Sequence, residues 1–265
     1  AGYFESKHGP LPLGNPNIGI QNVKKSKYVE ENMYNRRLDA SRTFNKNFSL
    51  DFPQKQVRAY SDLYDNAISL MKSRDLESFD LTKEPDDLRD KYGRDNFGQG
   101  CLLARRLVEN KVRFIEVQYG GWDMHADGNN PGMVKGMNML GWTVDKAVSA
   151  FLQDLEDRDL TDKVLLVLTG DFGRTPTINK KGGRDHWAKL GTLAFAGGGL
   201  PMGQVIGKAD RRNGEPSDNP ISPNMMMGTI LHTLFDFGQL RIAQGIPTEI
   251  LKRVEDAHPI PELVS

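Results

Sequence analysis

The feature that most constrains the fold is a set of three apolar runs, each followed by glycine. They occupy residues 112–119, 164–169 and 193–196, and the first two lead into segments rich in aspartate and histidine. The run VLLVLT at 164–169 is continuously apolar, which is typical of a strand buried on both faces of a parallel sheet. A helical pattern over residues 132–158 separates the first two runs. This strand–helix–strand order predicts an α/β fold, a sandwich in which helices cover both faces of a parallel sheet.

The chain before these runs is less regular. Residues 1–32 have glycine and proline at short intervals and predict an extended segment. Apolar residues at three- and four-residue spacing predict further helices over residues 33–48, 53–74 and 95–110, with a short one after Pro85. We therefore divide the chain into residues 1–92, an extended and helical segment packed on the core, and residues 93–265, the α/β body.

Charge and composition restrict the class of partner. Lysine plus arginine and aspartate plus glutamate both total 35, so the net charge is zero and nothing favours a nucleic-acid partner. No apolar run approaches the roughly 20 residues that span a bilayer, so we predict no membrane span. Cys101 is the single cysteine, which excludes an internal disulfide. The oligomeric state stays open.

The motif GGWDMHADGNN follows the first predicted strand. It presents Asp123 and His125 one residue apart, with Asp127 and Asn129 close behind. A carboxylate and an imidazole form a mixed donor set that suits zinc, manganese or iron. The alternative is an Asp- and Asn-rich turn that caps the following helix, and the motif alone favours this alternative.

Two later motifs support the metal hypothesis. In LTGDFGRTP, Asp171 follows the apolar run and a glycine. The nearby Arg174 could bind a phosphate or sulfate through two parallel N–H donors. The alternative is a structural Asp–Arg ion pair that stabilises the loop. In GGRDHW, Asp185 is either a ligand beside His186 or a carboxylate that orients the imidazole. Ligand sites of open α/β sheets lie at the carboxyl ends of the strands. We therefore predict that one divalent-metal site gathers these ligands: Asp123, His125, Asp171 and His186.

Other catalytic patterns do not occur in the sequence. There is no Gly-x-Ser-x-Gly elbow, no phosphate-binding or dinucleotide glycine pattern, and no His-Glu-x-x-His pair. The three remaining histidines are expected to play no ligand role. We place His8 in a surface loop, His232 within the core side of a helix, and His258 at an exposed position.

Four blocks in order carry a family resemblance: GGWDMHADGNN, LTGDFGRTPTIN, GGRDHW and LAFAGGGLPMGQVIGKAD. Together, over residues 93–237, they resemble the exported, sulfatase-like family known as domain of unknown function fifteen-hundred-and-one. That family is similar to the alkaline phosphatase superfamily of phosphatases, sulfatases and cofactor-independent phosphoglycerate mutases. The resemblance implies an alkaline phosphatase/sulfatase-like fold, an exported or periplasmic location, and a small phosphate or sulfate ester as substrate.

The resemblance also implies roles for individual residues. Asp123 and His125 would supply the first ligands of a zinc, manganese or calcium ion, His186 the later histidine, and Asp171 the acidic residue of the superfamily's Asp-His-Gly turn. Phe172 stands in place of that turn's histidine, which implies either a single-ion site or substitution by Asp127 or Asn129. Arg174 and Asn129 would contact the substrate, with Asp185 and Asp127 as outer carboxylates.

The superfamily's first strand ends in an Asp-Gly turn that supplies a ligand and then the nucleophile. Nothing similar occurs before Val112, so we expect the chain to be the C-terminal portion of a longer protein, without the N-terminal strands, the nucleophile or activity of its own. The leading hypothesis is a metal-dependent hydrolase of phosphate or sulfate esters. The second is a non-catalytic protein of the same fold that binds an anionic ligand or partner. An ordinary sugar- or nucleotide-binding α/β domain ranks last, because it lacks any motif.

Overall fold

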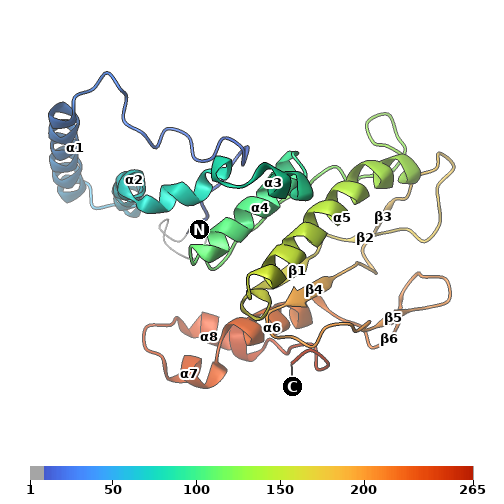
Figure 1. Ribbon diagram of the computed structural model, residues 1–265. Helices are drawn as coiled ribbons and strands as arrows, with labels where there is room; N and C mark the ends of the chain where they lie inside the picture. The colour runs from blue at the N-terminus through green and yellow to red at the C-terminus, as the bar shows by residue number, and fades with distance from the viewer. Residues whose placement is uncertain (1–8, 265) are drawn as a thin grey trace. The chain divides into compact units, whose positions relative to one another are not determined.

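The computed structural model describes residues 9–264, and the chain divides into two compact units, Ala1–Val117 and Gln118–Ser265 (Figure 1). The division falls later than the boundary we drew at residues 92/93. The reason is local packing: the helix that we assigned to the second part packs on elements of the first, as described next. His8 lies outside the described residues.

Over residues 9–117, every regular element of unit 1 is a helix. Its helices are α1 (Glu31–Asp51), α2 (Lys55–Lys72), η2 (Arg74–Phe79), η3 (Leu81–Lys83), α3 (Asp86–Tyr92) and α4 (Asn96–Glu109). The helices predicted from apolar spacing are confirmed, with ends that move by one to three residues. Helix α4 begins where Asp95 Oδ1 accepts hydrogen bonds from the N–H groups of Phe97 and Gly98, a standard N-cap. It packs on α3 and η2, with Tyr92 and Leu102 fully buried.

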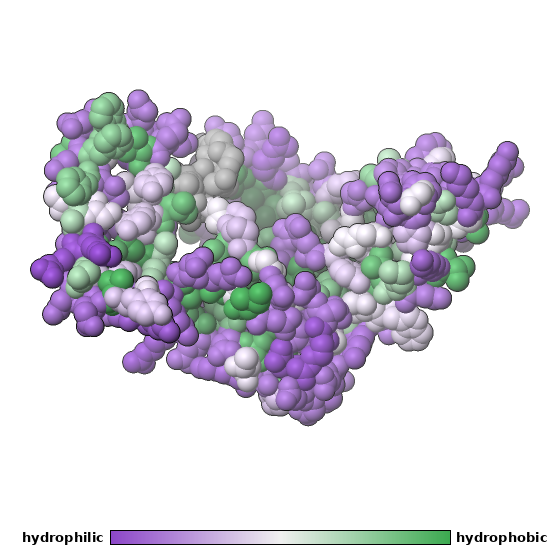
Figure 2. Space-filling view, turned by 90° about the horizontal axis from the view of Figure 1, so that it is seen from above, coloured by the Kyte–Doolittle hydropathy of each residue, from purple (hydrophilic) through white to green (hydrophobic). Residues whose placement is uncertain are grey.

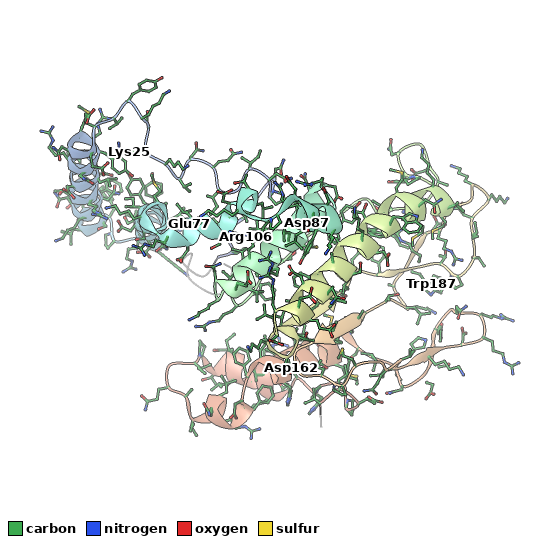
Figure 3. The ribbon with its side chains drawn as sticks, viewed as in Figure 1. Lys25, Glu77, Asp87, Arg106, Asp162 and Trp187 are labelled. Carbon is green, nitrogen blue, oxygen red and sulfur yellow. The ribbon has the colours of Figure 1, made fainter. Side chains whose placement is uncertain are left out.

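A buried ion cluster ties α4 to the segment before α3. Arg105 is only 1% exposed, and its guanidinium donates to Glu84 Oε2 at 2.5 Å and Glu109 Oε2 at 2.6 Å. Burial raises the pKa of Glu84, but hydrogen bonds from Arg105 and Arg106 outweigh it and lower the pKa below its usual value. Arg106 also donates to the backbone carbonyl of Glu77 at 2.8 Å. Glu77 and Arg106 are both labelled in Figure 3. Each charge in this cluster is therefore paired, as burial requires.

Unit 2 combines helices with short strands. Its helices are α5 (Met133–Asp157), η4 (Thr161–Lys163), α6 (Pro223–Leu234), α7 (Phe237–Ile242) and α8 (Thr248–Glu255). The long helix that we predicted over residues 132–158 is confirmed as α5. Its buried face includes Ala147, Phe151 and Leu155. Among residues 9–264 helix accounts for 48% and strand for 7%, so the described part of the protein is a mixed α and β structure in which helices predominate.

The described strands pair two by two, and each pair is antiparallel. They are β1 (Leu165–Leu168) with β4 (Ala194–Gly197), β2 (Gly173–Arg174) with β3 (His186–Trp187), and β5 (Lys208–Ala209) with β6 (Pro216–Asp218). The parallel order that we predicted for the runs at 164–169 and 193–196 is wrong. A parallel return requires a crossover, usually a helix. Residues 169–193 contain no helix, so the chain returns antiparallel.

Two further details differ from the prediction. Residues 112–119 alternate in burial from residue 115 to 119, but they form no strand in the structure, so the expected strand–helix–strand unit around α5 is not present. Strand β1 is half-buried along its length, because β4 is its single strand partner. No helix among residues 9–264 is both long and apolar enough to cross a membrane.

Purple hydrophilic side chains cover most of the face seen in Figure 2, in a chain of which 38% of the residues are hydrophobic. Large apolar side chains are nevertheless exposed on α1, where Phe44 is 74% and Leu50 71% accessible. The well-packed core of unit 1 therefore lies around α4 rather than around α1.

Candidate metal centre

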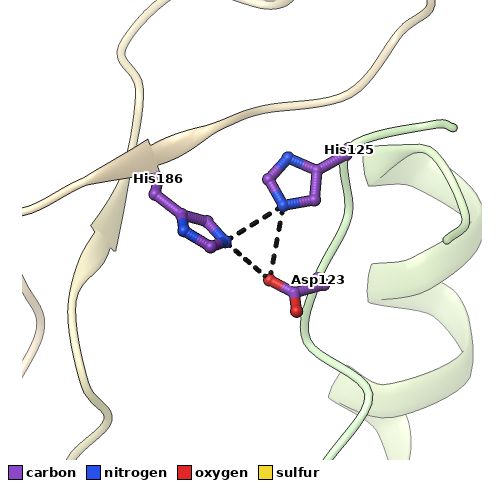
Figure 4. A group of neighbouring side chains, drawn as sticks. All are labelled: Asp123, His125 and His186. Carbon is purple, nitrogen blue, oxygen red and sulfur yellow. Dashed lines mark hydrogen bonds and ion pairs between the residues drawn. The ribbon is translucent and has the colours of Figure 1, made fainter.

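Three predicted ligands from distant parts of the sequence converge in unit 2. Asp123 and His125 lie on the segment before α5, and His186 lies on β3 (Figure 4). His186 Nε2 is 2.9 Å from Asp123 Oδ1 and 3.0 Å from His125 Nε2, and the third side, from His125 Nε2 to Asp123 Oδ1, is 3.4 Å. Two imidazole nitrogens and one carboxylate oxygen thus form a compact triangle.

Local sequence explains why Asp123 and His125 face the same way. Met124 between them is 3% exposed, and its side chain packs against Gly136 of α5, where an added Cβ would come within 2.7 Å of it. Successive side chains of an extended segment point to opposite sides. With Met124 turned inward, both neighbours turn outward toward His186.

The two glycines of GGRDHW bring His186 to the same place. Gly183 is buried, and a Cβ at this position would lie 2.2 Å from the carbonyl carbon and oxygen of His125. Next to it, the Arg184 N–H donates to the Met124 carbonyl at 2.9 Å, and the Met133 N–H donates to the Gly182 carbonyl at 3.1 Å. Because glycine has no side chain, the two backbones approach closely enough for these hydrogen bonds to form.

The guanidinium of Arg174 places a positive charge beside the three donor atoms. It is the cross-strand partner of His186, its Nη2 donates to Asp123 Oδ1 at 2.7 Å, and its Nη1 lies 3.5 Å from His125 Nε2. The hydrogen bond from Arg174, followed by that from His186, lowers the pKa of Asp123 to about 2. The carboxylate is therefore ionised at any physiological pH, as a metal ligand must be.

Asp185 contacts the His125 ring at Nδ1, the nitrogen that is not part of the triangle. Its Oδ1 lies 2.9 Å from His125 Nδ1, and this hydrogen bond is the main reason that the pKa of Asp185 is lowered. An ionised carboxylate only accepts, so Nδ1 carries the hydrogen; in the neutral ring the lone pair is then on Nε2, the nitrogen that faces Asp123 and His186. The sequence suggested that Asp185 orients an imidazole, and the structure places it against His125 rather than against its neighbour His186.

The spacing of the donors fits a divalent ion. An ion with bonds of about 2.0–2.2 Å separates tetrahedral ligand atoms by about 3.3–3.6 Å and adjacent octahedral ones by about 2.8–3.1 Å. The three measured separations run from 2.9 to 3.4 Å. Two histidines and one carboxylate are also the protein ligands of some catalytic zinc sites.

The comparisons with known proteins decide the family. The model of a family described as "Protein of unknown function (DUF1501)" matches residues 1–264. The chain belongs to the DUF1501 family. No curated protein and no solved structure matches it. The membership that the four sequence blocks suggested is thereby confirmed, and the match extends on both sides of residues 93–237.

The structure does not bring every predicted residue of this DUF1501 protein to the triangle. Asp171 is not one of the three converging side chains, and its Oδ1 accepts a hydrogen bond from the adjacent Phe172 N–H at 2.8 Å. Phe172 instead packs on the His186 ring, with centroids 4.2 Å apart. A role for Asp171 as a ligand stays a prediction.

The turn after His125 explains two further residues. Asp127 Oδ1 accepts hydrogen bonds from the N–H groups of Asn129 and Asn130, at 3.1 and 3.0 Å, and these bonds lower its pKa. Asn129 is exposed on this turn, and its contact with a substrate remains untested. The Asp- and Asn-rich turn that we considered is therefore real, but Gly132, the N-cap of α5, has no side-chain cap from it.

One residue at the candidate site was not predicted from the sequence. Asn179 contacts both His125 and Asp185, although the only signal in the sequence is an asparagine shortly before two glycines, which indicates a turn. The same residue lines an open hollow of about 470 Å³ beside the triangle. The other residues of its lining are His125, Asp127, Lys180, Lys181 and Asp185.

The positions predicted for His232 and His258 agree with the structure. His232 is half-buried, packs on Phe237 with centroids 3.9 Å apart, and has its pKa lowered by burial. His258 is exposed. Neither belongs to the metal triangle of unit 2.

Proposed function

We propose that this DUF1501 chain carries the metal-binding part of a hydrolase that acts on small phosphate or sulfate esters. The observation that carries the proposal is the convergence of Asp123, His125 and His186, whose two nitrogens and one oxygen are close enough to share one ion. Zinc or manganese suits these donors better than calcium, which prefers oxygen ligands. The resemblance to the alkaline phosphatase and sulfatase enzymes supports the choice of substrate. An exported or periplasmic location, and a larger parallel sheet in the complete enzyme, belong to the same proposal and rest on that resemblance alone.

Each residue has a defined task in this proposal. A bound ion would act as a Lewis acid that stabilises negative charge on the ester oxygen. Arg174, whose guanidinium lies against the triangle, would bind the sulfate or phosphate oxygens through paired N–H donors. No serine, threonine or cysteine among residues 9–264 hydrogen-bonds to the three donor atoms, so the nucleophile is proposed to come from another segment or from water.

Metal binding is the first test. We expect the purified chain to bind one divalent ion, measured by elemental analysis and calorimetry, and Asp123→Ala or His186→Ala to weaken binding at least 100-fold because each removes a ligand. His258→Ala is the matched control, since it removes an exposed histidine outside the site. Wild-type protein that binds no divalent ion would end the metal proposal.

Activity is the second test and requires the longest natural form of the protein. We expect metal-dependent release of the aryl alcohol from aryl phosphate or aryl sulfate, and loss of this activity on chelation. Aryl esters that stay intact although the metal is bound would contradict the hydrolase assignment and leave the metal site in place.

The contact between Arg174 and Asp123 favours a second candidate, a non-catalytic protein that binds an anion. A guanidinium can neutralise the carboxylate without any metal, and Phe172 covers one side of His186. In that case sulfate or phosphate binding, measured by calorimetry, would survive chelation and would be lost in Arg174→Gln. In the hydrolase proposal, chelation weakens anion binding.

A further inference from the structure

The side chain of Asn179 uses both ends of its amide, and each end serves a different segment. Its Oδ1 accepts from the backbone N–H groups of Lys181 and Gly183, both at 3.0 Å, and so closes the turn between β2 and β3. Its Nδ2 donates to the carbonyl of His125 at 2.9 Å and to Asp185 Oδ1 at 3.3 Å. Backbone N–H groups require an oxygen and acceptor oxygens require an NH2 group, so the orientation of this amide is determined by its partners.

Asn179 is linked to the His125 imidazole through Asp185. The same oxygen that accepts from Asn179 also accepts from His125 Nδ1 at 2.9 Å. Hydrogen at Nδ1 leaves the lone pair of a neutral ring on Nε2, the nitrogen that faces Asp123 and His186. A metal ligand needs this tautomer, and its ring orientation is commonly set by an outer hydrogen-bond partner.

From these contacts we infer that Asn179 is a positioning residue that sets the ring orientation and tautomer of His125. One NH2 group binds the main chain of His125 and also the carboxylate that holds its ring, so the two cannot shift independently. Asn179 touches none of the three donor atoms and acts only through Asp185 and the His125 backbone. The inference rests on the proposed metal site, in which His125 Nε2 is a ligand atom.

Asn179→Asp is the sharpest test, because it separates the two ends of the side chain. The variant keeps its size and the acceptor that closes the turn, but it replaces the NH2 donor with an oxygen that faces Asp185 and the His125 carbonyl. We expect zinc affinity to fall about 10-fold, as for other outer partners of metal-bound histidines. We also expect long-range ¹H–¹⁵N spectra of the metal-free chain to lose the pure Nδ1–H signature of His125.

Asn15→Asp is the matched control. Asn15 Oδ1 accepts from the backbone and side-chain nitrogens of Asn17, at 2.9 and 3.2 Å, so the same substitution preserves the function of that side chain. It should change neither zinc affinity nor the His125 spectrum. Asn179→Ala removes both the donor and the turn-closing acceptor without adding charge, and it should also reduce zinc affinity and alter the His125 spectrum if Asn179→Asp fails to fold.

Two results decide between this inference and the function on which it rests. Wild-type zinc affinity together with an unchanged His125 tautomer in both Asn179 variants would overturn the inference. If wild-type protein binds no zinc, the metal proposal fails, but the spectrum of the metal-free chain still shows whether Asn179 sets the His125 ring.

Discussion

Three side chains of the site lie close to a single carboxylate oxygen. Asp123 Oδ1 has His186 Nε2 at 2.9 Å, Arg174 Nη2 at 2.7 Å and His125 Nε2 at 3.4 Å. In the proposed metal site Arg174 would compete with the ion for this oxygen, and its Nη1 lies 3.5 Å from His125 Nε2, the second proposed ligand. When an ion binds, the guanidinium is expected to turn from Asp123 toward the negatively charged oxygens of an ester.

This competition gives an unusual prediction for Arg174→Gln. Removal of the guanidinium should increase zinc affinity a few-fold, because both the competing donor and the repulsion between two cations disappear. Sulfate affinity of the zinc-loaded protein should fall, because the forked donor is lost. Calorimetry with zinc and then with sulfate measures both; weaker zinc binding in the variant would contradict competition.

At the scale of elements, backbone docking assembles the site. The segment from Gly182 to Arg184 lies along the main chain of Met124 and His125, and β3 follows immediately with His186. A hydrogen-bonded backbone contact resists small shifts better than two exposed side chains would, so the donor spacing depends on how closely these segments approach.

Gly183→Ala tests this docking. Its Cβ would meet the His125 backbone at 2.2 Å, so the segments must separate, at a cost of about 1–3 kcal/mol in the free energy of unfolding. Zinc affinity should fall with it, because His186 moves away from Asp123. Gly170→Ala is the control, since a Cβ there meets nothing within 4 Å. Chemical denaturation and zinc titration of both variants provide the measurement, and a Gly183→Ala protein as stable as Gly170→Ala would refute the docking argument.

At the scale of the whole molecule, the three proposed metal ligands, Asp123, His125 and His186, all lie in unit 2, Gln118–Ser265. An ion that binds the folded state alone stabilises whatever folds with its site, by about 2.7 kcal/mol when its free concentration is 100 times Kd. Unit 1 has its own core and its own ion cluster around Arg105. Metal binding should therefore stabilise unit 2 against unfolding and leave the stability of unit 1 unchanged.

Hydrogen exchange resolves this selectivity along the chain. We expect zinc to slow amide exchange in residues 118–264, most strongly around His125 and β3, and to leave the amides of α4 unchanged. The reason is that slow exchange reports the free energy of opening of each cooperative segment. Equal protection of both units by zinc would show that they unfold together.

The sequence by itself determined the helices, the Asp-x-His presentation and the family, because these depend on short-range periodicity and on motifs that can be read locally. It did not determine strand direction: β1 and β4 satisfy the same apolar pattern in either orientation, and the helix-free connection between them decided for antiparallel. Local sequence likewise placed Asp185 beside His186, but the fold pairs it with His125, 60 residues away in the chain. Such partners are chosen by backbone contacts between distant segments, here at Gly183 and Asn179, and only the tertiary structure contains them.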